Sequence, residues 1–160
     1  MNFVVIFIVL AIALFVSAYI TKRRFGLLGL ALAAGSLLSE IWGYNAELIV
    51  GIAGIQSGVY SSAIVHSVII LLPAGLLLFH GYTYKSAIGR IIGAVMFTVL
   101  ALAFLIGPLG RILVMQGDVA RMYDWLTDNR EVIIGFGLTM SVFDLFLTKP
   151  AHLADKKHRH

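Results

Sequence analysis

The chain has 160 residues, of which 60% are hydrophobic and only 12% charged, and its mean hydropathy is +0.97. Soluble globular proteins are about half apolar and a quarter charged, so this composition is typical of a protein that lies in a lipid bilayer. The lack of cysteine excludes disulfide scaffolds, thiolate metal sites, iron–sulfur clusters and cysteine nucleophiles. The formal charge is +4, and in a membrane protein basic residues mainly set the topology rather than bind nucleic acid.

Five apolar segments approach the roughly 20 residues that a helix needs to cross the hydrocarbon. The first of them carries no charge and is followed by a basic cluster, the reverse of a cleaved signal peptide, so a retained helix is predicted. The five predicted spans cover residues 3–20, 25–42, 62–79, 88–106 and 132–147. We therefore predict an all-α, polytopic membrane protein, with one transmembrane domain over 1–148 and a basic cytoplasmic tail over 149–160.

Basic residues gather at three places, which follow the first, third and fifth predicted spans. They are Lys22, Arg23, Arg24, Lys85, Arg90, Lys149, Lys156, Lys157 and Arg159. Five spans put all three clusters on one side of the membrane, and the positive-inside rule makes that side the cytoplasm. We expect an integral protein of the plasma (inner) membrane with its N-terminus outside and its C-terminus in the cytoplasm.

The stretch LLSEIWGYNAELIVGIAG, residues 37–54, interrupts the apolar pattern with Glu40, Asn45 and Glu47. The second span has used its length by Trp42, and the apolar piece that follows has about 10 residues, which is too short to cross. A broken or re-entrant segment is therefore predicted over residues 43–58. Two interpretations stay open for the carboxylates: they are solvated groups of a surface loop, or they line an outward-facing vestibule.

The segment QGDVARMYDWLTDNRE, residues 116–131, sets charges between apolar residues that recur at spacings of three and four. This pattern predicts an external amphipathic helix on the outer leaflet before the fifth span, with Trp125 as an interface anchor, although a soluble partner is an alternative occupant of that surface. Arg111, near the outer end of the fourth span, is placed to reach the headgroups.

His66 and His80 lie 14 residues apart on nearly the same face of the third span. Such pairs can be axial ligands of two haems, but a facing helix would have to supply two further ligands, and the other histidines all lie in the tail. We therefore expect hydrogen-bonded histidines, with no cofactor and no metal. Asp144 is expected to pair with a basic group such as Arg90; a proton or cation relay is the alternative.

Small residues mark places where helices can approach closely. Gly29 lies on such a face of the second span, and Gly89 and Gly93 form a GxxxG motif, which indicates a packing surface inside the protein or in a dimer. The chain contains no Walker loop, no GxSxG elbow, no HExxH and no acid pair of defined spacing, so we expect it not to be an enzyme.

A family resemblance follows from the layout. The basic-glycine turn KRRFGLLGLALAAG, residues 22–35, the interrupted hydrophobic region and the segment KSAIGRIIGAVMFTVLALAFLI, residues 85–106, resemble the colicin V production protein family. Arg90 and Gly93 fit the entry to that family's last helix, whereas Gly89 stands where an aspartate is expected. The resemblance implies a small bacterial inner-membrane protein with a role in envelope homeostasis or export, and it carries over no catalytic residue.

Two functions remain as hypotheses. The first is a non-enzymatic scaffold or assembly subunit of the bacterial envelope, whose partners are the lipid bilayer and itself or other membrane proteins, with no nucleic acid. The second is a small oligomeric channel or transporter with acidic residues along its path. Carboxylates of Glu40 and Glu47 that face water would favour the first, and carboxylates that face the bundle would favour the second.

Overall fold

A computed structural model describes residues 3–52, 58–80, 83–84, 86–110, 112 and 118–147 of the chain. These residues form α1 (Phe3–Thr21), α2 (Phe25–Ile52), α3 (Val59–Phe79), α4 (Ala87–Gly110), α5 (Asp118–Asp128) and α6 (Arg130–Phe146). The predicted all-α class is confirmed.

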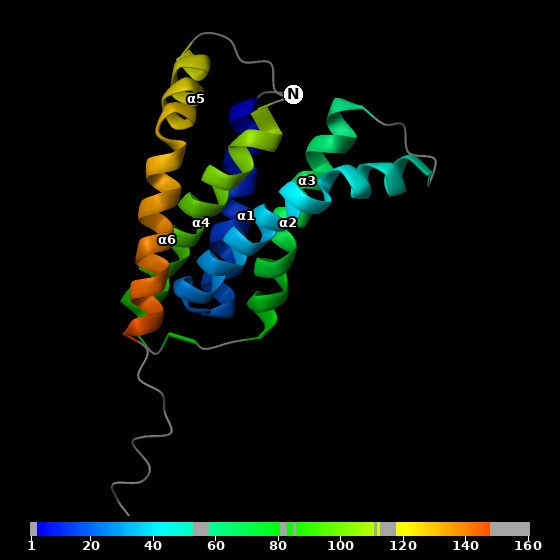
Figure 1. Ribbon diagram of the computed structural model, residues 1–160. Coiled ribbons are helices and arrows are strands. Elements are labelled where there is room, and N and C mark those ends of the chain that lie inside the picture. The colour runs from blue at the N-terminus through cyan, green and yellow to red at the C-terminus, as the bar shows by residue number, and fades with distance from the viewer. Residues whose placement is uncertain are drawn as a thin grey trace, which may run out of the picture.

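Consecutive long helices alternate in direction through the bundle (Figure 1). The helix α1 descends in the view and α2 rises, α3 descends and α4 rises, and α5 and α6 follow each other downward along one side. The C-terminal half of α2 leaves the bundle sideways, and the first turns of α3 lie above it at an angle, so these two helix ends project from the bundle.

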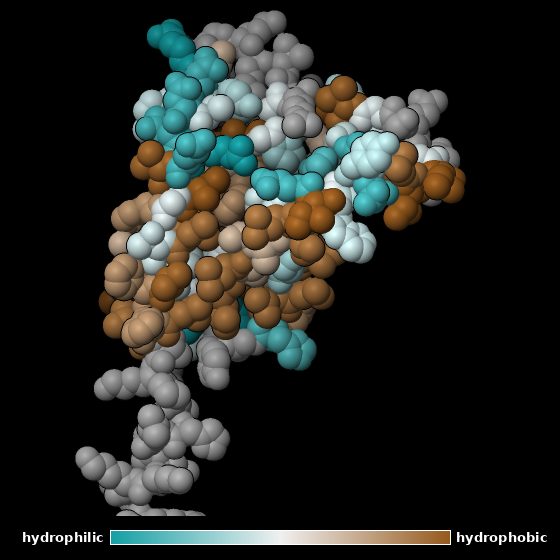
Figure 2. Space-filling view, in the orientation of Figure 1, coloured by the Kyte–Doolittle hydropathy of each residue, from teal (hydrophilic) through white to brown (hydrophobic). Residues whose placement is uncertain are grey.

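Three helices, α2, α3 and α4, are long and apolar enough to span a membrane. With 19 and 17 residues, α1 and α6 are shorter, and their role as spans stays a prediction. Large apolar side chains are exposed along several helices, among them Val9, Ile12, Val68, Leu72, Leu76, Val95 and Val99. Brown side chains cover the lower part of the visible face (Figure 2). So much exposed apolar surface is unfavourable in water and is expected where lipid chains cover it.

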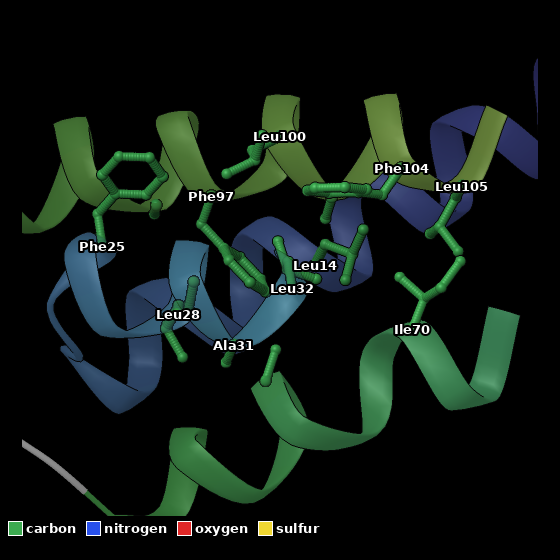
Figure 3. Packing of buried hydrophobic residues seen from close by; sticks show 14 residues of the cluster. Leu14, Phe25, Leu28, Ala31, Leu32, Ile70, Phe97, Leu100, Phe104 and Leu105 are labelled. Atoms are coloured by element: carbon green, nitrogen blue, oxygen red, sulfur yellow. The ribbon is translucent and has the colours of Figure 1, made fainter. Parts of the chain in front are cut away.

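The core lies between α1, α2, α3 and α4. Its largest side chains come from successive turns of facing helices and pack against one another (Figure 3). They include Leu14 of α1, Leu28 and Leu32 of α2, Ile70 of α3, and Phe97, Leu100, Phe104 and Leu105 of α4. Since Leu32, Phe97 and Leu100 are at most 1% exposed, the middle of the bundle is densely filled.

The predicted break after the second span is wrong over residues 43–52. The helix α2 continues from Phe25 to Ile52 through Asn45 and Glu47, with Gly43 inside it. Apolar length alone placed the end near Trp42, but a helix tolerates polar residues where a neighbouring element satisfies them, and α3 does this for Glu47. The remainder of the predicted segment, 53–57, lies outside the described residues.

The turns that follow α1 and α3 meet at one end of the bundle, together with the last turns of α6. We call this the basic end. Arg23 donates to the carbonyls of Leu78 and Phe79 at 2.9 and 2.6 Å, and the Tyr84 amide donates to the Lys22 carbonyl at 2.9 Å. Lys22 takes a left-handed conformation with φ 57°, which lets the chain reverse within three residues. The connections after α1 and α3 therefore lie side by side.

The glycines of the sequence motifs have neighbours of two kinds. A Cβ atom on Gly29 would overlap Ser141 of α6, so this position does hold two helices close together, as predicted. The GxxxG motif acts differently: the nearest atoms to a Cβ on Gly93 belong to the ring of Tyr84, the closest at 2.5 Å, and Gly89 lies near the same ring. Within the described residues this motif accommodates an aromatic side chain from the preceding turn rather than another helix.

Candidate functional site

Three residues of α2, spaced four apart, form a seat for a histidine of α3. Ser39, Gly43 and Glu47 share one helix face because a spacing of four residues is close to one turn. The His66 imidazole lies against this face, and a Cβ atom on Gly43 would overlap it. Gly43 is therefore the position that lets the ring approach α2 closely.

Both ring nitrogens of His66 are engaged. The Ser39 hydroxyl lies 2.7 Å from Nδ1, and an oxygen of Glu47 lies 3.2 Å from Nε2. Since an ionised carboxylate can only accept, Nε2 is the nitrogen that carries the proton in this pair, and in the neutral ring Nδ1 accepts from Ser39. Ser62, one turn before His66, donates to the same oxygen of Glu47. We call Ser39, Glu47, Ser62 and His66 the histidine clasp.

A cavity of about 230 Å³ adjoins the histidine clasp. Four helices contribute to its wall, and Arg130 enters it from the first turn of α6. The lining residues are Ser36, Ser39, Glu40, Ser62, Ala63, His66, Ile70, Phe104, Gly107, Pro108 and Arg130. We call this cavity the polar pocket. Hydrophilic side chains form a band across the visible face, above the brown lower part (Figure 2).

The floor of the polar pocket is apolar. Ile70 and Phe104, each 4% exposed, close it on the side of the basic end. One turn further in that direction lie Leu100 of α4 and Leu32 of α2, which are fully buried. Within the described part of the chain, the polar pocket is thus separated from the basic end by the packed core of Figure 3.

Arg130 is held by the helix opposite. Its Nε donates to the Ala103 carbonyl of α4 at 3.1 Å, and its terminal nitrogens lie beside Gly107. A guanidinium so anchored keeps the remaining N–H groups for another acceptor. Sequence reasoning missed Arg130 because it assigned this residue to the external amphipathic segment.

The structure brings together only part of the predicted set of functional residues. Glu40 and His66 both line the polar pocket, and Glu40 is exposed there. Glu47 does not line this pocket; it is half-buried in the adjoining histidine clasp. Asn45 lies exposed on α2. His80 ends α3 at the opposite end, and Arg111 lies outside the described residues.

Asp144 and Arg90 both lie toward the basic end but do not pair, which corrects the predicted contact. The Asp144 carboxylate accepts from the Gly26 amide at 2.9 Å, at the N-terminus of α2, where the helix dipole favours negative charge. Arg90 instead lies over the ring of Tyr19, 4.7 Å from its centroid, and donates to the Tyr19 carbonyl. Only the expected contact with Arg90 is corrected, because the Arg24 guanidinium also lies beside Asp144 and donates to its backbone carbonyl at 3.4 Å.

Tyr84 completes the basic end. Its hydroxyl accepts from the Phe25 amide at 3.1 Å, and its ring lies near the Arg24 guanidinium. Burial raises the pKa of the Tyr84 hydroxyl, with a further upward contribution from the nearby Asp144 carboxylate. The neutral phenol is therefore the form that fits this end.

The side chains that line the polar pocket can bind a ligand through charges and hydrogen bonds. Among the described residues no three His, Cys, Asp or Glu side chains come together in a metal-binding group. One carboxylate, one guanidinium and several hydroxyls line a small cavity with an apolar floor. No protein-family model, curated protein or solved structure matches the chain.

Proposed function

We propose that this chain is a non-enzymatic integral protein of the bacterial plasma membrane that acts as a scaffold or assembly subunit of the envelope. The observation that carries the proposal is the filled core beneath the polar pocket. Leu32, Phe97 and Leu100 leave no continuous polar route between the two ends within the described part of one chain. A monomer built this way binds and positions other molecules but does not conduct.

The gathering of basic connections supports the proposed five-span topology. The turns after α1 and α3 are hydrogen-bonded to each other, and Asp144 near the end of α6 contacts Gly26 at the same end. Arg23, Arg24 and Arg90 belong to this end, so the positive-inside rule orients it toward the cytoplasm. The polar pocket then opens toward the outside, and the N-terminus lies outside with it.

The projecting ends of α2 and α3 are the proposed surface for partners. Several large apolar residues are exposed there, among them Ile49 at 66%, Ile52 at 87% and Tyr60 at 70%. These ends diverge from the other helices (Figure 1). We propose that another membrane protein, or a second copy of this chain, packs against them.

A small channel or transporter is the second candidate, and the histidine clasp is the observation that favours it. Glu47 faces α3 rather than open water, which is the orientation expected of a residue along a path. Because the core of one chain is filled, such a path would have to run between protomers.

Ion flux into proteoliposomes, measured together with the mass of the purified protein in nanodiscs, separates the two candidates. The scaffold proposal predicts flux no higher than that of empty vesicles. A defined homo-oligomer with flux that Glu40→Gln/Glu47→Gln abolishes would overturn it in favour of the channel. Glu131→Gln is the matched control, because it removes one exposed carboxylate outside the polar pocket.

A further inference from the structure

Two opposite charges line the polar pocket without pairing. Glu40 comes from α2 and Arg130 from α6, and within the described residues no salt bridge joins these two side chains. Arg130 is partly buried, and a charge in a partly enclosed site is costly unless an opposite charge or several hydrogen bonds compensate it. We propose that the polar pocket binds a compact zwitterionic group, with a primary ammonium and a phosphate or carboxylate a few bonds apart.

Arg130 supplies the anion-binding side. Its Nε is committed to the Ala103 carbonyl, which fixes the plane of the guanidinium, and its terminal nitrogens lie beside Gly107. A carboxylate or phosphate matches two N–H groups of a guanidinium and accepts from both. Gly107 has no side chain to cover that approach, since a Cβ atom there would lie 3.2 Å from one terminal nitrogen of Arg130.

Glu40 and the wall formed by α4 supply the cation-binding side. The Glu40 carboxylate is exposed at the pocket and accepts only. Pro108 also lines the pocket and has no N–H, so the Phe104 carbonyl lacks its usual helical donor. A primary ammonium has three donors, which suits a carboxylate and a backbone carbonyl better than a quaternary ammonium would.

The other polar groups restrict what else can bind. Both nitrogens of His66 are occupied by Ser39 and Glu47, and Ser62 also donates to Glu47, so the histidine clasp offers few donors to a ligand. A volume of about 230 Å³ holds a small molecule or a headgroup, given that a water molecule takes about 30 Å³ of liquid. The apolar floor leaves no further polar space for a longer polar ligand.

Two sources supply this chemistry: a free amino acid or phosphoethanolamine in solution, and the phosphoethanolamine headgroup of a membrane lipid. Wild-type protein in phosphatidylcholine nanodiscs, titrated with glycine, O-phosphoethanolamine, ethanolamine and inorganic phosphate, tests the first. Native mass spectrometry after exchange into mixed phosphatidylethanolamine and phosphatidylcholine nanodiscs tests the second. Binding in the first arm alone identifies a soluble ligand, and preferential retention of phosphatidylethanolamine identifies a lipid headgroup.

The expected result is that a zwitterion binds at least about tenfold more tightly than ethanolamine or phosphate alone, since each half-ligand satisfies only one charge. Arg130→Gln and Glu40→Gln should each weaken zwitterion binding by about ten- to a hundredfold. Arg121→Gln and Glu131→Gln, which change charges outside the pocket, should leave it unchanged.

The inference would be overturned if phosphate and the zwitterion bound equally well, or if no zwitterion bound in the first arm and phosphatidylethanolamine was not retained preferentially in the second. These measurements use the wild-type protein, so they do not depend on whether a variant folds. The inference goes beyond the proposed function and fails separately from it. Ion flux would contradict the scaffold proposal and would leave the inference of zwitterion binding intact. If neither zwitterion binding nor ion flux is detected, only the inference of zwitterion binding is contradicted.

Discussion

The two ends of the bundle use polar residues in opposite ways. At the basic end, Arg23 and Asp144 bind backbone groups at helix termini, and Arg90 lies over an aromatic ring. At the other end, Glu47 and His66 lie inside long helices and bind each other beside a cavity. Every helix leaves N–H and C=O groups at its ends without an intrahelical partner, and polar side chains at helix termini satisfy these groups. Such side chains are therefore explained by the fold. Polar groups in helix interiors have no such task, and they are the candidates for function.

The largest effect is expected where α2 and α3 touch through their backbones. A Cβ atom on Gly35 would overlap the carbonyl oxygen of Ile70, which cannot swing aside as a side chain can. We predict that Gly35→Ala lowers the free energy of unfolding in detergent by about 1–3 kcal/mol. Gly75→Ala is the control, because nothing lies within 4 Å of its Cβ position, and it should be neutral or slightly stabilising. Equal stability of the two variants would contradict the close approach.

A smaller effect is expected at the histidine clasp. His66→Ala leaves Ser39 and Glu47 without their shared partner, and we predict a loss of about 1 kcal/mol in the free energy of unfolding. In a double-mutant cycle, Ser39→Ala and His66→Ala should be coupled, so that the second change costs less once the first is made. Strict additivity would mean that the two side chains do not interact.

Much of the bundle could be predicted from apolar length, because a helix in lipid must satisfy its own backbone and so appears as a long apolar run. The predicted segments 3–20 and 25–42 begin at the first residues of α1 and α2. The continuation of α2 past Trp42 could not be predicted this way, since the groups that satisfy Glu47 come from α3. The spacing of Ser39, Gly43 and Glu47 was the available signal, and it indicates a shared face without showing what lies on it.

The role of the GxxxG motif and the site role of Arg130 were beyond sequence reasoning for a similar reason. Glycines at 89 and 93 indicate room beside a helix, but not that Tyr84 fills it. Arg130 looks like one more charge in an amphipathic segment until the first turn of α6 is placed against Ala103 of α4.

The smallest effect is expected at Tyr84 and depends on pH. Its pKa is raised in the folded protein, so above about pH 10 the unfolded chain loses this proton first and the folded state is destabilised relative to it. Below that pH the phenol is neutral in both states, and its contribution to stability is constant. We predict that Tyr84→Phe reduces the alkaline decline in stability above about pH 10. Identical alkaline slopes for this variant and the wild type would contradict the burial of the Tyr84 hydroxyl.

The central claim is that the polar pocket reaches water from one side only. Since the chain has no cysteine, single-cysteine variants can be labelled with a membrane-impermeant maleimide in oriented vesicles. We predict that Ser36→Cys in the pocket is labelled only from the side opposite to Ser86→Cys at the basic end, and that Thr98→Cys in the core is labelled from neither side. Labelling of Ser36→Cys from both sides, or of Thr98→Cys from either, would show a continuous aqueous path and contradict the account.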